Sequence, residues 1–338
     1  MTPFFLIFVL IVCFSAALFL GSVFIGLGRK MHLVNTNNTS SIGGIAVLFA
    51  WWIAVLLMKN LKLEMFWPLL VASLLILLIG LWDTRHPLGP IMQLLAQISI
   101  AAVPVFFGGL EIKYLTNPFG GVIDFTNIRV WGLLLPSAVI TLIWIVTLMN
   151  AVNFLDGMDG LAGSVGTVAF IVIGLVSMLP QVNDLGTAVS AFAAAAALLG
   201  FIFWNYPPAP LILGTVGSWF IGFLLAVLAV QGATKVATTA VVGAVPLLDA
   251  AVVVFGRLWR GRSPFMGDRT HLHYRLKRRG LSDKAILAIY MAGSIGLGCA
   301  AVLLQTQNKI LVFCIFSTMF VFLIYLGSLV VKRRSKRE

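Results

Sequence analysis

The chain has 338 residues, of which 60% are hydrophobic and only 10% are charged. This composition excludes a soluble globular protein and indicates a polytopic membrane protein. The formal net charge of +12 is attributed to membrane topology and anionic headgroups rather than to nucleic-acid binding, because no soluble domain and no aromatic-basic platform accompanies it.

Apolar stretches long enough to be membrane spans follow one another along the chain, since about 20 apolar residues cross a bilayer. We expect an all-α polytopic membrane protein made of one integral membrane domain over residues 1–338. The first stretch is expected to be retained, because no basic region precedes it and no small-residue cleavage site is evident. The eleven predicted spans are 3–27, 43–58, 66–82, 91–107, 132–149, 161–179, 186–204, 213–231, 237–256, 285–304 and 310–331.

The lysines and arginines are distributed unevenly between the two ends of these spans. With the N-terminus outside, loops after odd-numbered spans hold 16 of the 23 basic residues and loops after even-numbered spans hold 6. Loop 257–283 and tail 332–338 carry most of them, so the positive-inside rule makes both cytoplasmic. Outer loops are short except 108–131, whose Gly, Pro, Asn and β-branched residues predict a hairpin.

Polar residues gather at the predicted cytoplasmic ends of the spans. Asp83 closes the third span, and Gly43 and Gly44 at the mouth of the second predict a close approach of the backbone to a ligand. Asp249 lies about two turns inside the ninth span, where we expect it to pair with Arg257 or with a neighbouring helix.

The segment 150–161, Asn-Ala-Val-Asn-Phe-Leu-Asp-Gly-Met-Asp-Gly-Leu, carries the strongest functional signal. A charged side chain in or beside the bilayer costs roughly 2.5–3.5 kcal/mol, so such groups usually mark a function. Asn153, Asp156 and Asp159 are spaced by three, but all three do not share one helix face, because six residues turn a helix by about 240°. Gly157 and Gly160 predict a break, and oxygen ligands on irregular backbone suit Mg²⁺. The alternative interpretation is a helix end with solvated acids.

The loop 257–283 contains two histidines two residues apart, His271 and His273, among several arginines that include Arg269. Arginine makes bidentate, charge-assisted bonds to phosphate, and histidine adds a neutral or protonated donor. A zinc site is not favoured, because no cysteine lies nearby. The alternative is a solvated basic loop held at the headgroups.

The motifs together resemble those of the polyprenyl-phosphate N-acetylhexosamine-1-phosphate transferases, which are relatives of the phospho-N-acetylmuramoyl-pentapeptide translocase. The resemblance covers most of the chain, and the segment 150–161 is its most specific motif. Ser263-Pro-Phe-Met-Gly-Asp-Arg-Thr-His-Leu-His273 resembles the histidine-containing loop of the branch that acts on UDP-N-acetylglucosamine. Three further segments are similar to family motifs: Gly80–Arg85 with Gln97 downstream, Asn205–Ala209 and Leu213–Ser218.

The resemblance implies transfer of a sugar 1-phosphate from a UDP-N-acetylhexosamine to undecaprenyl or another polyprenyl phosphate, with release of UMP. It implies an enzyme of the bacterial inner membrane whose active site faces the cytoplasm. Such an enzyme would initiate synthesis of a cell-envelope glycan such as O-antigen or teichoic acid. Whether the protein forms a homodimer is left open. The catalytic and Mg²⁺-binding residues (Mn²⁺ as a substitute) would be Asp83, Asp156 and Asp159. The substrate-binding residues would be Asn153, Asn205, Arg269, His271 and His273.

Two departures from the family pattern raise the question of whether the protein is an active enzyme. The second of two adjacent acids after the third span is Thr84, and the acid of the Gly-Asp-x-Gly-Ser motif is Thr215. The rival interpretation is therefore a catalytically impaired homologue that binds polyprenyl phosphate or a nucleotide sugar. A transporter is the other alternative, since intramembrane acids also mark ion pathways. It is disfavoured because the acids gather at span ends and no internal repeat is visible.

Overall fold

The computed structural model describes residues 3–35, 38–58, 63–117, 121–126, 129–130, 133–232, 235–261, 271–304 and 308–320. Helices account for most of them: α1 (Pro3–Lys30), α2 (Gly44–Met58), α3 (Leu63–Arg85), α4 (Pro90–Ala102), α5 (Leu135–Leu155), α6 (Leu161–Met178), α7 (Leu185–Asn205), α8 (Gly214–Gln231), α9 (Lys235–Val242), α10 (Ala244–Leu258), α11 (Leu272–Arg278) and α12 (Asp283–Leu303). The π-helix η1 (Val103–Phe107) continues α4, and Asn308–Phe320 forms a further apolar helix.

The protein is a multi-pass membrane protein, and the all-α prediction is confirmed. Within the described ranges, 8 helices are long and apolar enough to cross a membrane, or up to 9 if the bent pair α9–α10 is one span. If the bent pair is counted as one span, the nine spans of the described residues are two fewer than the eleven predicted, for two identifiable reasons. Helix α2 has only 15 residues, and the last predicted span continues beyond Phe320, outside the described residues.

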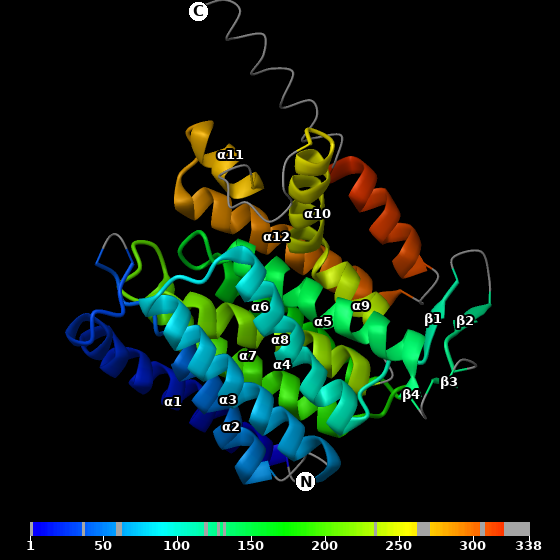
Figure 1. The fold of residues 1–338 in the computed structure, drawn as a ribbon. Coiled ribbons are helices and arrows are strands. Elements are labelled where there is room, and N and C mark those ends of the chain that lie inside the picture. The colour runs from blue at the N-terminus through cyan, green and yellow to red at the C-terminus, as the bar shows by residue number, and fades with distance from the viewer. Residues whose placement is uncertain are drawn as a thin grey trace, which may run out of the picture.

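The centre of the bundle is α8, which is buried along most of its length. It contacts α2, α3, α5, α6, α7 and α9, and Figure 1 shows it in the middle of the molecule with α5, α6 and α7 around it. Small residues permit this packing. A Cβ atom at Gly44 would collide with the backbone of Gly217, and one at Gly222 would collide with that of Leu148 and Met149. As in other membrane bundles, small residues let the helix backbones approach one another.

Three local features differ from, or refine, the sequence predictions. Helix α5 continues six residues past the predicted end at 149, so Asn150 and Asn153 lie on its last turns. The predicted span 237–256 is broken at Gly243, where α9 and α10 meet at 79°. The predicted hairpin is confirmed as the antiparallel strands β1 (Tyr114–Thr116) and β2 (Val122–Asp124), and the short strands β3 (Arg129–Val130) and β4 (Leu133–Leu134) also pair.

The hairpin and the polar motifs lie at opposite ends of the bundle. Strand β4 leads directly into the N-terminus of α5, whereas the motif 150–161 follows from its C-terminus. A 21-residue helix is about 30 Å long, which is also the thickness of the hydrocarbon core. In Figure 1 the strands lie at the right edge, and α10 and α11 lie at the top.

Candidate active site

The N-terminus of α8 is the point at which polar side chains from the ends of α3 and α5 meet. The chain enters α8 at Gly214 with a φ of 66°, a left-handed conformation that glycine adopts without strain. A Cβ there would also collide with the carbonyl oxygen of Ser41. The first turn of α8 thereby presents one backbone N–H group and two hydroxyl groups, those of Thr215 and Ser218, to its surroundings.

Asp83, on the last turn of α3, is 7% exposed and is held by three donors. Its Oδ1 accepts from the Leu88 N–H at 2.8 Å and from Gln93 Nε2 at 3.1 Å. Its Oδ2 accepts from Thr215 Oγ1 at 2.5 Å. An ionised carboxylate offers about four acceptor sites, so Asp83 retains capacity for about one more donor or cation.

Asn153 and Asp156 meet the same turn of α8 from the end of α5. Asn153 Oδ1 accepts from Ser218 Oγ at 2.8 Å, and Asp156 accepts from the Gly214 N–H. Burial raises the pKa of Asp156 well above its ordinary value; the Gly214 N–H opposes the shift, and the nearby Asp159 carboxylate adds to it. A bound cation would stabilise the charged form of Asp156, which burial and the neighbouring carboxylate both disfavour.

The remaining residues of the motif form a tight turn between α5 and α6. Gly160 has a φ of 76°, as its predicted role in a break requires. Its N–H donates to Asn205 Oδ1 at 3.0 Å, while Asn205 Nδ2 donates to the Leu211 carbonyl at 2.9 Å. Asp159 Oδ2 accepts from the Ala209 N–H at 3.0 Å. The buried Asn205 amide therefore ties the turn to the end of α7, and contact with a substrate remains only a prediction for this residue.

The short helix α11 brings the two histidines against this turn. A Cβ at Gly157 would lie 3.0 Å from His273 Nε2 and 2.8 Å from Tyr274 Oη. The His271 ring lies 5.0 Å from the ring of Phe154 and is nearly parallel to His273, with centroids 5.9 Å apart. The sequence predicted that both histidines and Arg269 bind one substrate. The structure brings His273 to Gly157 and His271 to Phe154, on the same segment, while Arg269 lies outside the described residues.

His273 is buried, with 1% of its surface exposed. Burial lowers its pKa to about 4, so the ring is neutral at pH 7. In the described part of the chain neither ring nitrogen has a hydrogen-bond partner. Buried polar atoms are usually satisfied, so an unpartnered pair beside the acidic turn is suited to a bound polar ligand.

The two threonines that depart from the family pattern occupy different environments. Thr84 Oγ1 donates to the Gly80 carbonyl at 2.8 Å within its own helix. Thr215, by contrast, donates to Asp83. A carboxylate at position 215 would face Asp83 with a like charge, whereas the threonine hydroxyl supplies a donor to it. Thr215, Ser218 and Gln93 were not among the predicted site residues, although the first two lie in the predicted Leu213–Ser218 motif.

The donor set fits a magnesium ion that is completed by substrate. Within the described ranges, no group of three or more His, Cys, Asp or Glu side chains lies close enough together to hold a metal ion. Asp83, Asp156 and Asp159 therefore do not form a ready three-carboxylate cage. Mg²⁺ needs only one or two carboxylates when phosphate oxygens complete its coordination shell, so its binding here stays a prediction.

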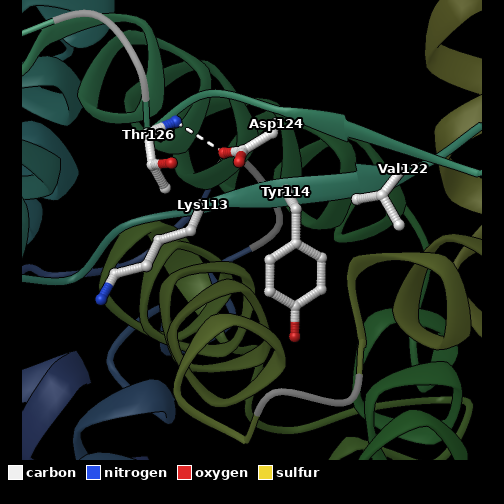
Figure 2. A pocket seen from close by; sticks show the side chains of 5 residues that line it. All are labelled: Lys113, Tyr114, Val122, Asp124 and Thr126. Carbon is white, nitrogen blue, oxygen red and sulfur yellow. Dashed lines mark hydrogen bonds between the residues drawn. The ribbon is translucent and has the colours of Figure 1, made fainter.

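A hollow of about 480 Å³ lies elsewhere, at the β1–β2 hairpin. Figure 2 shows the side chains that line it, with the Asp124 carboxylate accepting from the Thr126 N–H at 2.7 Å: Lys113, Tyr114, Val122, Asp124 and Thr126. It lies at the opposite end of α5 from the aspartates and is not part of their site.

Comparisons with known proteins identify the family of the chain. Residues 66–233 match the family model of glycosyl transferase family 4. The decaprenyl-phosphate N-acetylglucosaminephosphotransferase of Mycolicibacterium smegmatis is 31% identical over 79% of this chain and 73% of its own length. The undecaprenyl-phosphate alpha-N-acetylglucosaminyl 1-phosphate transferase of Haemophilus influenzae is 28% identical over 81% of this chain and 76% of its own.

Other matches are shorter. The chain spans 36% of the length of the related transferase of Pasteurella multocida, at 32% identity. It spans 29% and 36% of the length of the first relatives, which are from Streptomyces coelicolor and Bacillus subtilis.

Two findings establish the family of the chain. They are the long match to the mycobacterial protein and the match of the family model to the helices α3–α8. The chain belongs to glycosyl transferase family 4, in the group of polyprenyl-phosphate N-acetylglucosamine-1-phosphate transferases.

Proposed function

We propose that the protein transfers N-acetylglucosamine 1-phosphate from UDP-N-acetylglucosamine to a polyprenyl phosphate and releases UMP. The observation that carries the proposal is the meeting of Asp83, Asn153 and Asp156 at the first turn of α8, with α11 beside them. The names of the relatives support the acceptor and the transferred group. N-acetylgalactosamine or a related sugar would suit the same chemistry, so the donor is an outcome of the test.

In the proposed reaction an acceptor phosphate oxygen attacks the phosphorus that carries the sugar. A new phosphorus–oxygen bond forms, the bond between the two phosphates of the donor breaks, and UMP leaves with the bond's electron pair. Asp83 has about one acceptor site left and is the candidate to take a proton from the acceptor phosphate. Asp156 and Asp159 would hold Mg²⁺ or Mn²⁺, which supplies positive charge to the diphosphate and the leaving group.

The donor is proposed to bind between the acidic turn and α11. His273 is neutral and its nitrogens are unpartnered within the described residues, so it is able to donate one hydrogen bond and accept another. Arg269 is proposed to bind the diphosphate, since arginine forms bidentate bonds to phosphate.

The site is proposed to face the cytoplasm of a bacterial inner membrane, with the N-terminus outside. Basic residues of α11 and its C-cap, which lie beside the site, support this orientation. There the product would enter synthesis of a cell-envelope glycan such as O-antigen or teichoic acid.

Membranes containing the protein, supplied with undecaprenyl phosphate, Mg²⁺ and radiolabelled UDP-N-acetylglucosamine, test the proposal. Label is expected to enter the organic phase, to disappear with EDTA, and to fall by at least about 100-fold in Asp156→Asn. Asp184→Asn is the matched control. Asp184 caps α7 at the other end of the bundle, and asparagine is an equally good cap. Loss of label in the control as well would refute a specific role for Asp156.

The impaired-homologue alternative predicts a different result. With no label from any UDP-sugar in folded protein, the proposal fails. If the native protein shows only a feeble activity and Thr84→Asp combined with Thr215→Asp raises that activity, the native site is impaired. The Thr215–Asp83 hydrogen bond instead argues that the threonine supports Asp83, so good turnover in the native protein and a loss in the double variant are expected.

A further inference from the structure

Asp249, on α10, forms two hydrogen bonds with the start of α11. Its Oδ2 lies 3.1 Å from His271 Nδ1, and its Oδ1 accepts from the Leu272 N–H at 2.7 Å. Asp249 and His271 are only 2% and 5% exposed. One carboxylate thus fixes both the backbone and the side chain at the N-cap of α11.

We propose that Asp249 is a positioning residue that sets the proton on His271 Nδ1 and holds the ring against the Asn153–Asp159 segment. An aspartate accepts only, so the nitrogen facing it must carry hydrogen. In the neutral ring the other nitrogen, Nε2, is then an acceptor. A partner that fixes the tautomer and orientation of a functional histidine is a recurring arrangement in enzymes.

The surroundings of His271 explain why its orientation matters. Its ring stands between Phe154, one residue from Asn153, and His273, which lies against Gly157. Rotation of His271 would disturb both contacts. The bend of 79° at Gly243 directs α10 so that Asp249 reaches α11, and this gives a buried acid within a predicted span a specific partner.

The variant Asp249→Asn distinguishes the positioning of the His271 ring from simple anchoring of the start of α11. It keeps the shape and one carbonyl acceptor, but its amide presents hydrogens where the aspartate presents an acceptor. With the carbonyl on Leu272, the NH₂ group faces His271 and selects the tautomer protonated at Nε2. His271→Asn is the complementary variant, because its amide still donates to Asp249 while the second ring nitrogen is lost.

The first readout is independent of activity. The chain has 4 histidines, so nitrogen-15 histidine labelling of the full-length protein in proteoliposomes gives few imidazole signals, and His271→Asn identifies the one of interest. In spectra recorded at about pH 8.5, the neutral His271 ring is expected to carry its proton on Nδ1 in the native protein and on Nε2 in Asp249→Asn. A native proton on Nε2, or no change in the variant, would overturn the proposal.

The second readout rests on the proposed function. Asp249→Asn is expected to lower kcat by about 10- to 100-fold, with a smaller change in KM for the UDP-sugar. In the His271→Asn background the same change should alter kcat by no more than about twofold, because residues that act through one another are not additive. Additive losses would show that Asp249 acts independently of His271 and would refute the positioning role.

Asp184→Asn controls for the loss of a capping carboxylate, since Asp184 likewise accepts from one backbone N–H and one side chain, those of Thr187. It should leave kcat and the histidine signals unchanged. If the native protein shows no turnover with any UDP-sugar, the proposed function fails while the labelling experiment still decides the Asp249–His271 pairing.

Discussion

At the scale of single residues, Thr215 is the more informative of the two departures from the family motifs that the sequence resembles. Its hydroxyl donates to the buried Asp83 carboxylate, and a hydrogen bond to a charged group contributes about 1.5–3 kcal/mol. Thr215→Val keeps the shape and removes the donor, so transferase activity should fall by about 10- to 100-fold. Thr215→Ser retains the donor and should stay close to the native rate, measured as label transferred to lipid. Equal rates in the two variants would show that the hydroxyl has no role.

Residue identities in the motifs could be predicted from sequence, but several pairings could not. The segment 150–161 identified Asn153, Asp156 and Asp159 because polar groups at a span end are unusual. Hydropathy, however, ended the span at 149, whereas α5 runs to Leu155. The difference arises because a helix satisfies its own backbone hydrogen bonds whatever its side chains are, so the helix continues beyond the last apolar residues. The amide of Asn150 there finds a partner on another element, Gln97.

The pairing of Asp249 with His271 shows the limit more clearly. The two residues are 22 positions apart, and their contact depends on the bend between α9 and α10. Arg257 or a neighbouring helix was the predicted partner of Asp249, and the hydrogen bonds to the start of α11 confirm the second alternative. The bond to His271 itself could not be predicted, because spacing along one helix and charge were the only guides available. It requires the three-dimensional path of the chain after Gly243.

At the scale of elements, the approach of α2 to α8 fixes the position of the first turn of α8, in the candidate active site. Gly43 and Gly44 were predicted to admit a ligand; instead their N–H groups donate to Ile212 and Leu213 at 3.0 Å, directly before α8. Their small size therefore serves backbone packing. The first turn of α8, which carries Thr215, is positioned by these contacts.

Gly44→Ala should consequently destabilise the protein, because its Cβ would collide with the backbone of Gly217. Overpacking of this kind costs about 1–3 kcal/mol, to be measured as a lower unfolding temperature in detergent with reduced transferase activity. Gly26→Ala in α1 is the control: a Cβ there meets nothing within 4 Å, and alanine favours a helix by about 1 kcal/mol over glycine. Similar unfolding temperatures for both variants would contradict the packing argument.

At the scale of the whole molecule, the two ends of the bundle differ in chemistry. One end holds Asp83, the turn after α5 and the basic helix α11 (Figure 1). The other holds the β1–β2 hairpin and the turn that leads into α7 at Asp184. The proposed reaction, which joins a soluble nucleotide sugar to a membrane lipid, would require this polarity, because the donor would reach the site from one side only.

The polarity gives a topology prediction that is independent of activity. In a variant without Cys13, Cys299 and Cys314, single cysteines at the exposed positions Gln181 and Arg278 report opposite ends of the bundle. A membrane-impermeant maleimide should label Gln181→Cys in intact cells, and Arg278→Cys only after the membrane is opened, since basic residues stay inside. Labelling of Arg278→Cys in intact cells would place α11 outside. The donor site would then face away from the cytoplasm, so the same result would contradict the proposed reaction as well as the topology.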